Sequence, residues 1–292
     1  MLLRILQFGA GGQLARALIR AVETRDIALT VRGSDEVDIG DPAALAEALS
    51  DVGTHDLVIN AAAYTAVDRA EAEPLKARAI NASAPRQMAG ACARADVPLV
   101  HVSTDYVFDG SGDRPWREDD PTAPLNLYGQ TKLEGEHAIW RTTDRAAVIR
   151  TSWVVSERAG NFLTTMLRLG AERETLRVVA DQHGRPTLAD DLAAFLLDAA
   201  PRWAEGDAEA CGIFHFANAG ATTWAGLAEA VLAEAGIATP VEQITTAEWP
   251  TPARRPFNSV LDTGKVERTF GVTPRPWRAA IGEAVAQIME QA

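Results

Sequence analysis

The sequence predicts an α/β protein built on a doubly wound, Rossmann-type parallel sheet, with a smaller α/β lobe interleaved with it. Up to about residue 149, short β-branched runs alternate with amphipathic segments of helix length. This alternation is typical of parallel strands joined by crossover helices. Most of the expected strands are almost continuously apolar, as strands covered by helices on both faces are. A glycine-rich turn follows the first strand, where such folds bind a dinucleotide.

The expected strands of the first half are residues 4–8, 28–32, 57–60, 99–103 and 147–151. The segments between them repeat apolar residues at helical spacing. The expected helices are residues 12–23, 42–50, 74–95 and 127–140.

Beyond residue 151 the alternation is less regular. We expect strands at 176–180 and 212–217, helices at 188–199 and 223–235, and an ordered, proline-rich loop at 249–258. The predicted division is a dinucleotide-binding domain at 1–151, with a later contribution from about 176–200, and a smaller substrate-binding lobe at 152–175 and 201–292.

The composition excludes several classes of partner. The chain has 292 residues, of which 47% are hydrophobic, and a formal net charge of −12. A field of this sign repels phosphate backbones and anionic membrane surfaces, so neither nucleic acid nor a membrane is expected. The apolar start is broken by Arg4 and is too short for a signal-peptide core or a membrane span. Cys92 and Cys211 are expected as two buried thiols, and the cytoplasm is the expected location.

The turn after the first strand predicts a pyrophosphate site. Glycines there let the backbone turn tightly and bring amide hydrogens at a helix N-terminus against an anion. The spacing, Gly9-x-x-Gly12-x-x-Ala15, differs from Gly-x-Gly-x-x-Gly, but alanine is tolerable last because that position packs the helix on the strand.

The tip of the second strand predicts the cofactor. Arg32, with Ser34, can accept a 2′-phosphate, because a guanidinium binds phosphate in a bidentate manner and an acid would repel it. NADPH is therefore the expected cofactor, and NADH is a permitted second choice.

Tyr128 and Lys132 predict a proton-transfer site. Four residues apart, they are neighbours on one helical face, and the strand that ends near Thr104 brings a hydroxyl to the same sheet edge. A free tyrosine has a pKa of about 10, so action near neutrality requires a decrease of about 3 units, or about 4 kcal/mol. A fixed lysine charge and an oxidised nicotinamide are suitable sources of that decrease. The three residues together form a carbonyl-reducing constellation.

Other polar residues are expected to be structural. None of the five histidines, His101 included, has the spacing of a metal ligand. The acidic pairs Asp119-Asp120 and Asp190-Asp191 are typical of solvated or helix-capping groups.

Several longer segments, in order along nearly the whole chain, resemble those of one family. They are residues 9–15, 60–71, 103–110, 128–132, 150–154, 181–187 and 252–256. In this combination the chain resembles the dTDP-4-dehydrorhamnose reductases, which are extended short-chain dehydrogenase/reductases.

The resemblance implies that NAD(P)H reduces the 4-keto group of dTDP-4-dehydro-6-deoxy-L-mannose to give dTDP-L-rhamnose. It implies that Tyr128 donates the proton, that Lys132 binds the nicotinamide ribose and lowers the tyrosine pKa, and that Thr104 polarises the carbonyl. The implied cofactor contacts are Gly9, Gly11, Gly12, Gln13 and Leu14 at the pyrophosphate, Asp38 and Ile39 at the adenine, and Ala61, Ala62, Ala63, Tyr64 and Thr65 along the cleft.

On the substrate side, the resemblance implies that Asp105 and Trp153 face the sugar. A planar indole suits a deoxysugar with an apolar methyl group, although a buried core tryptophan is the plain alternative. Arg254 and Arg255 are expected to neutralise the nucleotide diphosphate, which an anionic protein must attract locally.

Two departures from the family affect other expectations. Some members dimerise through magnesium held by glutamates, but here the first helix has Ala17 and Asp190 alone makes no site, so no structural magnesium is expected. A monomer and a homodimer both stay open. His183 and Arg185 are unusual in the segment 181–187 and leave its contacts open.

Two other functions are alternatives. A nucleotide-sugar epimerase or 4,6-dehydratase shares the fold, but dehydratases follow the threonine with Asp-Glu, whereas this chain has Thr104-Asp105-Tyr106. A non-catalytic subunit similar to the regulatory subunit of methionine adenosyltransferase has no chemical need for Thr104, Tyr128 and Lys132 together.

Overall fold

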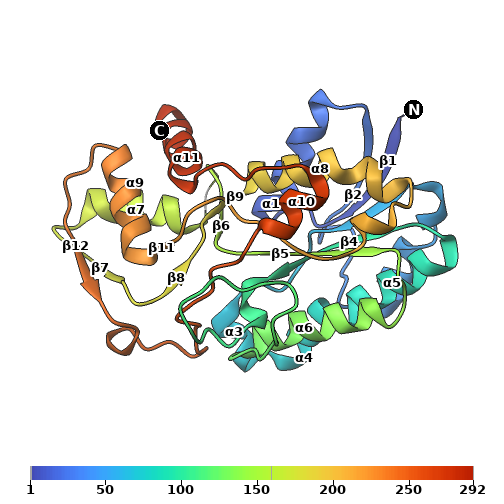
Figure 1. Cartoon of the computed structure of the whole chain (residues 1–292), viewed down its shortest axis with the longest axis horizontal. Helices are drawn as coiled ribbons and strands as arrows, with labels where there is room; N and C mark the ends of the chain where they lie inside the picture. The colour runs from blue at the N-terminus through green and yellow to red at the C-terminus, as the bar shows by residue number, and fades with distance from the viewer. Residues whose placement is uncertain (1, 159, 292) are drawn as a thin grey trace.

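The computed structural model describes residues 2–158 and 160–291. A large sheet with helices on both faces forms one end of the molecule, and a smaller lobe forms the other (Figure 1). The large sheet has six parallel strands in the order β10-β5-β4-β3-β1-β2, which confirms the predicted fold class. These strands are β1 (Leu3–Phe8), β2 (Ile27–Arg32), β3 (Leu57–Asn60), β4 (Leu99–Thr104), β5 (Ala146–Thr151) and β10 (Gly212–His215).

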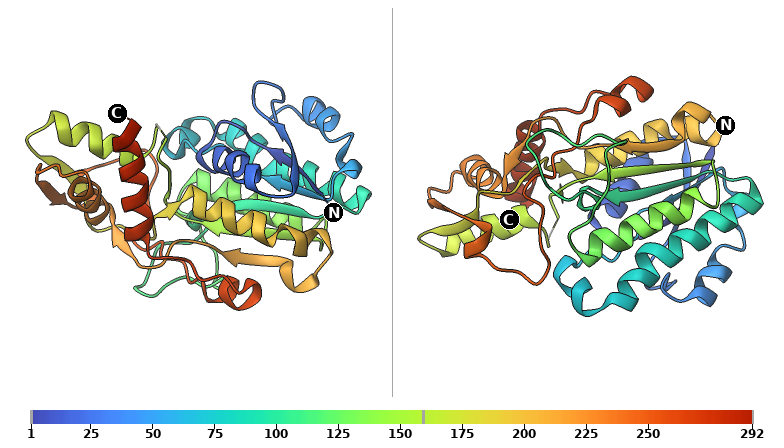
Figure 2. Two further views of the ribbon diagram at one scale, coloured as in Figure 1. Left: turned by 90° about the horizontal axis from the view of Figure 1, so that it is seen from above. Right: turned by 60° about the horizontal axis from the view of Figure 1, so that its bottom comes forward.

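Alternating side chains of the strands enter two separate cores. Ile5 of β1 packs into the core under one pair of helices, and its neighbour Leu6 packs into the core on the opposite face. The first face is covered by α1 (Gln13–Ala21) and α8 (Ala189–Ala204). The second is covered by α2 (Pro42–Ala48), α5 (Ala84–Ala95) and α6 (Leu127–Trp140), and Figure 2 shows α5 and α6 side by side across it. Because both faces are covered, the strands are mainly apolar.

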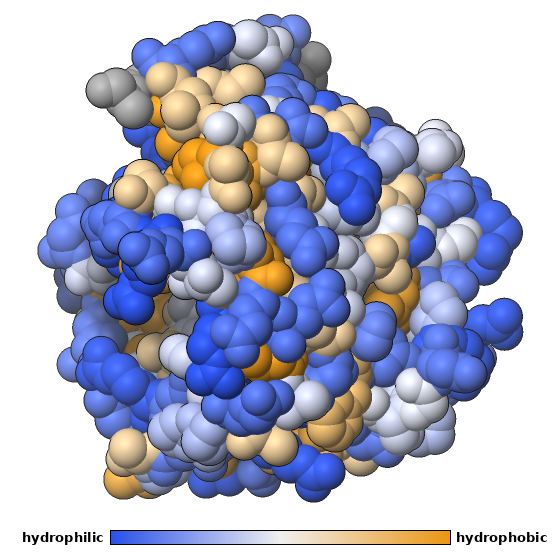
Figure 3. Space-filling model, turned by 90° about the vertical axis from the view of Figure 1, so that its left-hand side faces the viewer, coloured by the Kyte–Doolittle hydropathy of each residue, from blue (hydrophilic) through white to orange (hydrophobic). Residues whose placement is uncertain are grey.

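The smaller lobe has its own apolar core, to which Leu163, Leu232 and Ile281 contribute. Its main elements are α7 (Phe162–Glu172), β7 (Leu176–Val179), α9 (Trp224–Glu234), β12 (Val241–Ile244) and α11 (Trp277–Gln291). Four two-residue strands form two small sheets apart from the large one: β6 (Val154–Val155) pairs with β9 (Thr187–Leu188), and β8 (His183–Gly184) pairs with β11 (Thr222–Thr223). Figure 3 shows this end of the molecule, where hydrophilic residues predominate and apolar ones form separate patches.

Some elements differ from the expectation. Within 201–292, β10 pairs with β5 and extends the large sheet, followed by α10 (Gly264–Phe270). The division into two lobes with the stated boundaries stays a prediction. The helices α3 (Val67–Ala72), α7 and α11 were not anticipated.

The single helix expected at 74–95 is three segments: α4 (Pro74–Arg78), a π-helical turn (Ala79–Ser83) and α5. Pro85 explains the interruption, because it has no N–H to donate to the carbonyl of Asn81 four residues earlier. Such π turns are frequent at functional sites.

The structure also bears on the expectations for the two cysteines and for a membrane. Cys92 is buried but Cys211 is only half-buried, so the expectation of two buried thiols is wrong for Cys211, which lies just before the edge strand β10; both thiols are free. Among the described residues, the helices are all too short or too polar to cross a membrane.

Candidate active site

The predicted site residues gather at the carboxyl edge of the large sheet. The glycine loop follows β1, the segment 61–65 follows β3, and Thr104 ends β4. The N-terminal turn of α6 packs against the residues that follow β4, which brings Tyr128 to the same edge. In open α/β sheets this edge is where ligands bind.

The glycine loop has the shape of an anion cradle. Gly9 has a φ of +100°, and a Cβ there would lie 3.0 Å from the backbone nitrogen of Ala62. A Cβ on Gly11 or Gly12 would meet no described atom within 4 Å, so the space above both residues is open. Gly12 caps α1 without a side-chain hydrogen bond from any described residue, which leaves the first amides of the helix for a ligand. These features fit a pyrophosphate.

Gln13 and Leu14 offer this site their backbone rather than their side chains. The Gln13 amide donates to the Val154 carbonyl at 2.9 Å and accepts from the Ser156 hydroxyl at 3.1 Å, which ties α1 to the chain after β5. The Leu14 side chain is buried in the core. A ligand at the glycine loop therefore meets peptide N–H groups.

Sequence reasoning missed the side chain that braces this loop. The amide nitrogen of Gln7, in β1, donates to the carbonyls of Gly9 (2.7 Å) and Ala15 (3.1 Å), the two ends of the turn. Gln7 is fully buried, and a polar residue inside an apolar strand was the available signal.

The adenine end of the predicted cofactor site is rich in charge. A guanidinium nitrogen of Arg32, at the end of β2, lies 3.2 Å from Asp51, and another lies 3.8 Å from Glu36. The Asp38 carboxylate accepts from the backbone of Gly40, and Ile39 packs against the core. Arg32 is thus held at the predicted 2′-phosphate position by two carboxylates that also share its charge.

Asn81, which sequence reasoning also missed, fixes the segment 61–65. From the π-helical turn, its side chain accepts from the Tyr64 amide (2.9 Å) and donates to the Tyr64 carbonyl (3.1 Å) and the Thr131 hydroxyl (3.1 Å). The three alanines before Tyr64 are half-buried, Thr65 is exposed, and the Tyr64 hydroxyl donates to Glu73. The interruption of the helix therefore connects the predicted cofactor segment to α6.

The start of α6 is fixed by two contacts. The Asn126 side chain accepts from the Gly129 amide at 2.9 Å and donates to the Arg254 carbonyl at 2.8 Å. A Cβ on Gly129 would lie 2.1 Å from the Tyr106 carbonyl oxygen, so the helix can approach the residues after β4 only with glycine there. Tyr128 consequently sits in the first turn of α6.

Tyr128 is half-buried, and its ring meets Tyr106 edge to face at 5.9 Å between ring centroids. Burial raises the pKa of the phenol to about 12, although the Thr104 hydroxyl acts to lower it. The phenol therefore keeps its proton at neutral pH. The protein, Lys132 included, therefore raises this pKa on balance, so the expected decrease requires the charge of an oxidised nicotinamide.

Lys132, one turn later, is buried. Its Nζ donates to the Val102 carbonyl at 2.6 Å and lies 3.2 Å from Nε2 of His101. Burial lowers the pKa of the amine to about 8, and Glu136 opposes that decrease. A lysine with its pKa near neutrality is typical of functional sites.

Thr104 and Asp105 form a hydroxyl–carboxyl pair beside Tyr128. The Thr104 hydroxyl donates to Oδ1 of Asp105 at 2.9 Å, whereas Oδ2 is buried without a hydrogen-bond partner in the described part of the chain. Burial raises the pKa of Asp105 to about 7. One carboxylate oxygen therefore lacks the partner that buried polar atoms ordinarily have.

Two of the three remaining predicted substrate residues, Trp153 and Arg255, already have partners in the protein. Trp153 has a φ of +48°, and its half-buried ring stacks on Trp224 with 3.6 Å between ring centroids, against the core of the smaller lobe. The Arg255 guanidinium binds the Asp68 carboxylate at 2.7 Å, whereas Arg254 is exposed. Whether Trp153 also faces a sugar stays a prediction.

A cavity of about 350 Å³ lies beside these residues. Its lining includes the aromatic side chains of Trp224 and Trp249 and the polar side chains of Asp68, Gln182 and Arg255. The position of Asp68 and Arg255 near Tyr106 connects this cavity to the surroundings of Tyr128.

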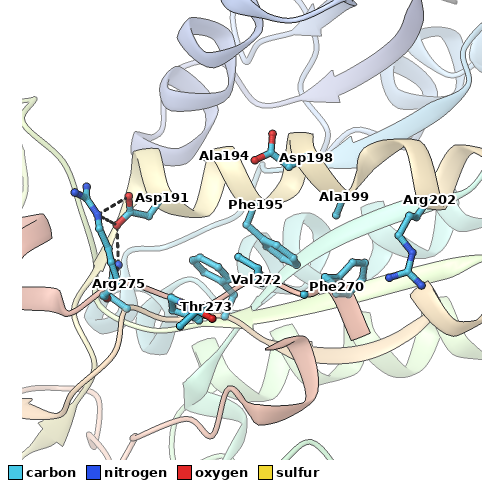
Figure 4. A pocket seen from close by; sticks show the side chains of 14 residues that line it. Asp191, Ala194, Phe195, Asp198, Ala199, Arg202, Phe270, Val272, Thr273 and Arg275 are labelled. Atoms are coloured by element: carbon cyan, nitrogen blue, oxygen red, sulfur yellow. Dashed lines mark hydrogen bonds and ion pairs between the residues drawn. The ribbon is translucent and has the colours of Figure 1, made fainter. Parts of the chain in front are cut away.

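A second cavity, of about 470 Å³, lies between α8 and the residues that precede α11 (Figure 4). Phe195 and Phe270 line its apolar part. Its charged groups are paired, as Arg275 is with Asp191 at 2.8 Å. The lining found in the described chain includes none of the predicted site residues.

The paired acidic residues and the histidines do not form a metal site among the described residues. Residues 2–158 and 160–291 contain no group of three or more His, Cys, Asp or Glu side chains placed to hold a metal ion. That no structural magnesium binds stays a prediction.

A parallel sheet with an open glycine loop, and a Tyr–Lys helix and a threonine at one edge, defines a dinucleotide-dependent oxidoreductase of the extended short-chain dehydrogenase/reductase class. The family model described as RmlD substrate binding domain matches residues 3–290. The chain belongs to the dTDP-4-dehydrorhamnose reductase family, as its relatives also indicate.

The dTDP-4-dehydrorhamnose reductase of Burkholderia thailandensis is 41% identical over 300 residues, covering 99% of this chain and 100% of that protein. The crystal structure of a dTDP-4-dehydrorhamnose reductase from Clostridium acetobutylicum matches with a TM-score of 0.92 and 33% identity, over 99% of this chain and 100% of that chain. A dTDP-4-dehydrorhamnose reductase from Bacillus anthracis, in complex with NADP, matches with a TM-score of 0.90 and 30% identity over 100% of both chains.

Proposed function

We propose that this protein reduces the 4-keto group of dTDP-4-dehydro-6-deoxy-L-mannose to give dTDP-L-rhamnose, with NADPH as the cofactor and NADH as a permitted second. The full-length relatives carry this activity in their names, and one solved relative binds NADP. The observation that supports the proposal is that Thr104 ends β4 beside Tyr128, with Lys132 one turn further along α6, at the sheet edge that also carries the open glycine loop.

The residues of the glycine loop and the β2 tip would hold the cofactor. The free amides at Gly11, Gly12 and the start of α1 suit the pyrophosphate, and Arg32 suits the 2′-phosphate of NADPH. The segment 61–65, braced by Asn81, would line the cleft. When bound, NADPH supplies the hydride that reaches C4 of the sugar.

Tyr128 would supply the proton. With a pKa of about 12 the phenol is fully protonated at neutral pH, as a proton donor must be. The alkoxide that forms at C4 is more basic than a phenolate, so the proton moves to the substrate oxygen. The positive end of α6 and the ammonium of Lys132 stabilise the phenolate that remains. The Thr104 hydroxyl would hold the same substrate oxygen.

The other residues beside Tyr128 would position the substrate. The free Oδ2 of Asp105 can accept a hydrogen bond from a sugar hydroxyl. The nearby cavity of about 350 Å³ would receive the nucleotide end of the substrate. Arg254, which is exposed, can bind the diphosphate, whereas Arg255 would do so only while it also binds Asp68.

The test is to mix the purified protein with NADPH and the 4-keto sugar nucleotide, to follow the NADPH absorbance, and to identify the sugar product. We expect one NADPH consumed for each dTDP-L-rhamnose formed. An epimerase or dehydratase would change the sugar with no net consumption of NADPH, and a regulatory subunit would change neither. Either result would refute the reductase.

We also propose that the enzyme acts in the cytoplasm, as a monomer or a homodimer. The free thiols of Cys92 and Cys211 support a reducing compartment. Light scattering of the purified protein decides between the two assemblies.

A further inference from the structure

Lys132 contacts one member of a buried pair of side chains that has no part in the reaction described above. His101 in β4 and Asn60 in β3 are register partners, and both are 0% exposed. Nδ2 of Asn60 lies 3.0 Å from Nδ1 of His101, and Nε2 of the same ring lies 3.2 Å from Nζ of Lys132. The contacts thus run from β3 through β4 to α6.

The orientation of the Asn60 amide determines which ring nitrogen carries the proton. The backbone N–H of Ala62 donates to Oδ1 of Asn60 at 3.1 Å, so the NH₂ group must face His101. An NH₂ group can only donate, and Nδ1 of His101 therefore accepts. Burial and the charge of Lys132 hold the pKa of His101 well below its usual value of 6.5, so the ring is neutral. A neutral ring that accepts at Nδ1 carries its proton on Nε2, which faces Lys132.

This arrangement distinguishes between the two forms of Lys132. A neutral amine has a lone pair that accepts from Nε2–H, whereas an ammonium has only donors and would oppose another donor. The Val102 carbonyl accepts from either form. The other charged group that acts on Lys132 is Glu136 on its own helix, which favours the ammonium but is itself bound to Arg150 of β5. The histidine therefore opposes the effect of the glutamate.

We propose that Asn60 and His101 are a positioning pair, which fixes the imidazole proton on Nε2 and thereby controls the position and the charge of Lys132. Ala62, which fixes Asn60, lies in the predicted cofactor segment, so one network connects that segment to the lysine. The pair sets the pH above which Lys132 loses its charge. This kinetic consequence rests on the proposed reduction, whereas the ring tautomer does not.

The first test measures the tautomer directly. ¹⁵N chemical shifts of histidine side chains distinguish Nε2–H, Nδ1–H and imidazolium forms, and the His101 signals are those absent from a His101→Gln variant. We expect the neutral Nε2–H form across the neutral pH range. A neutral Nδ1–H ring or an imidazolium in the wild-type protein would overturn the proposal, whether or not the protein turns over substrate.

The second test reverses the tautomer. In Asn60→Asp, the carboxylate still accepts from Ala62 but now also accepts from the ring, so the proton moves to Nδ1 and Nε2 can accept from the ammonium. We expect the alkaline limb of kcat/KM to move up by at least about 1 pH unit, a tenfold change in the proton affinity of Lys132. Asn60→Ala, which adds no charge, should move the limb in the same direction by less.

A matched control is His137→Gln, because His137 is exposed on the same helix and should leave the limb in place. A limb that stays fixed in both Asn60 variants would show a purely structural role and contradict the proposal. A limb that moves in Asn60→Asp alone would reflect the added charge and contradict it too. If the wild type consumes no NADPH, the proposed function fails, and the tautomer measurement still decides on the pair.

Discussion

Two layers of buried polar side chains lie between α6 and the large sheet, and they differ in how completely their charges are matched. In the first layer, near the start of α6, the only hydrogen-bond partners of Lys132 among the described residues are a carbonyl and His101, and Asp105 keeps an oxygen that has none there. In the second, one turn further along, the Arg150 guanidinium binds Glu136 through two nitrogens, at 2.7 Å and 3.0 Å.

Both charged groups of the second layer have a further partner. The Ser103 hydroxyl donates to Glu136 at 2.5 Å, and the Arg150 guanidinium lies 5.1 Å from the centre of the Phe108 ring. Burial raises the pKa of Asp105 to about 7, although the hydroxyls of Ser259 and Thr104 act to lower it, and no cation among the described residues meets this carboxyl. The comparison teaches that the same helix can have two roles. Paired charges stabilise the fold, whereas groups without a counter-charge stay reactive at a cost in stability.

The largest expected effect is that of Tyr128→Phe, one helical turn before Lys132. Loss of the proton donor should lower kcat by about 10²–10⁴-fold, the usual contribution of a positioned acid. Because the hydroxyl is not part of the predicted pyrophosphate site, NADPH affinity should stay within about twofold, a change under 0.5 kcal/mol. Steady-state kinetics and cofactor titration measure the two quantities. Equal losses in both would indicate that the phenol is structural.

Glu136→Gln should break the second layer. Arg150 would then be a buried charge without a counter-ion, which costs about 3–5 kcal/mol of unfolding free energy. Urea denaturation measures this loss. The kcat of the folded fraction should change far less than in Tyr128→Phe.

The control for that variant replaces both partners with apolar residues, Glu136→Leu with Arg150→Met. Such double replacement is often neutral for stability, so most of the loss should be recovered. If the double variant is no more stable than Glu136→Gln, the ion pair does not account for the loss.

Asp105→Asn should increase the free energy of unfolding, whereas Glu136→Gln decreases it. The carboxyl has a pKa of about 7 in the folded chain against an ordinary 3.8, so folding takes up a proton in this window and stability falls as pH rises through it. The amide removes this penalty, and we expect a gain on the order of 2–4 kcal/mol at about pH 8 and little change at about pH 4. Denaturation at the two pH values tests this, and a loss of stability at the higher pH would contradict it.

Gly129→Ala should have the smallest effect of the four. The added Cβ would lie 2.1 Å from the Tyr106 carbonyl, so α6 must move away from the residues after β4. We expect a loss of about 1–3 kcal/mol, as for other overpacked sites, together with a lower kcat. Gly90→Ala, inside α5, controls for the loss of a helical glycine without a close approach, because the added Cβ would lie 3.5 Å from the Arg94 guanidinium. Equal kinetic effects of the two variants would argue against the close approach at Gly129.

The sequence predicted most of what local patterns encode. The helix expected at 127–140 has those bounds, because the Asn126 cap and the apolar spacing are both local. The expected strands agree within a residue or two at each end for the same reason. The π turn was missed because it depends on how Pro85 changes a helix that otherwise continues.

The supporting side chains of the site were harder to predict. Gln7 and Asn81 act through backbone carbonyls and amides distant along the chain, and such pairings have no spacing signature. His101 was expected to be structural; its partners come from β3 and α6, so its effect on Lys132 is visible only once these elements pack. Long-range polar contacts of this kind require the fold first.

The most direct test of the account is the fate of the transferred hydrogen. The protein is supplied with NADPH deuterated at its transferable position and with the 4-keto sugar nucleotide, and the product is analysed by NMR. We predict one deuterium at C4 of dTDP-L-rhamnose for each NADPH consumed. A product without deuterium at C4, or a sugar changed without consumption of NADPH, would contradict the assignment of Thr104, Tyr128 and Lys132 as a carbonyl-reducing site.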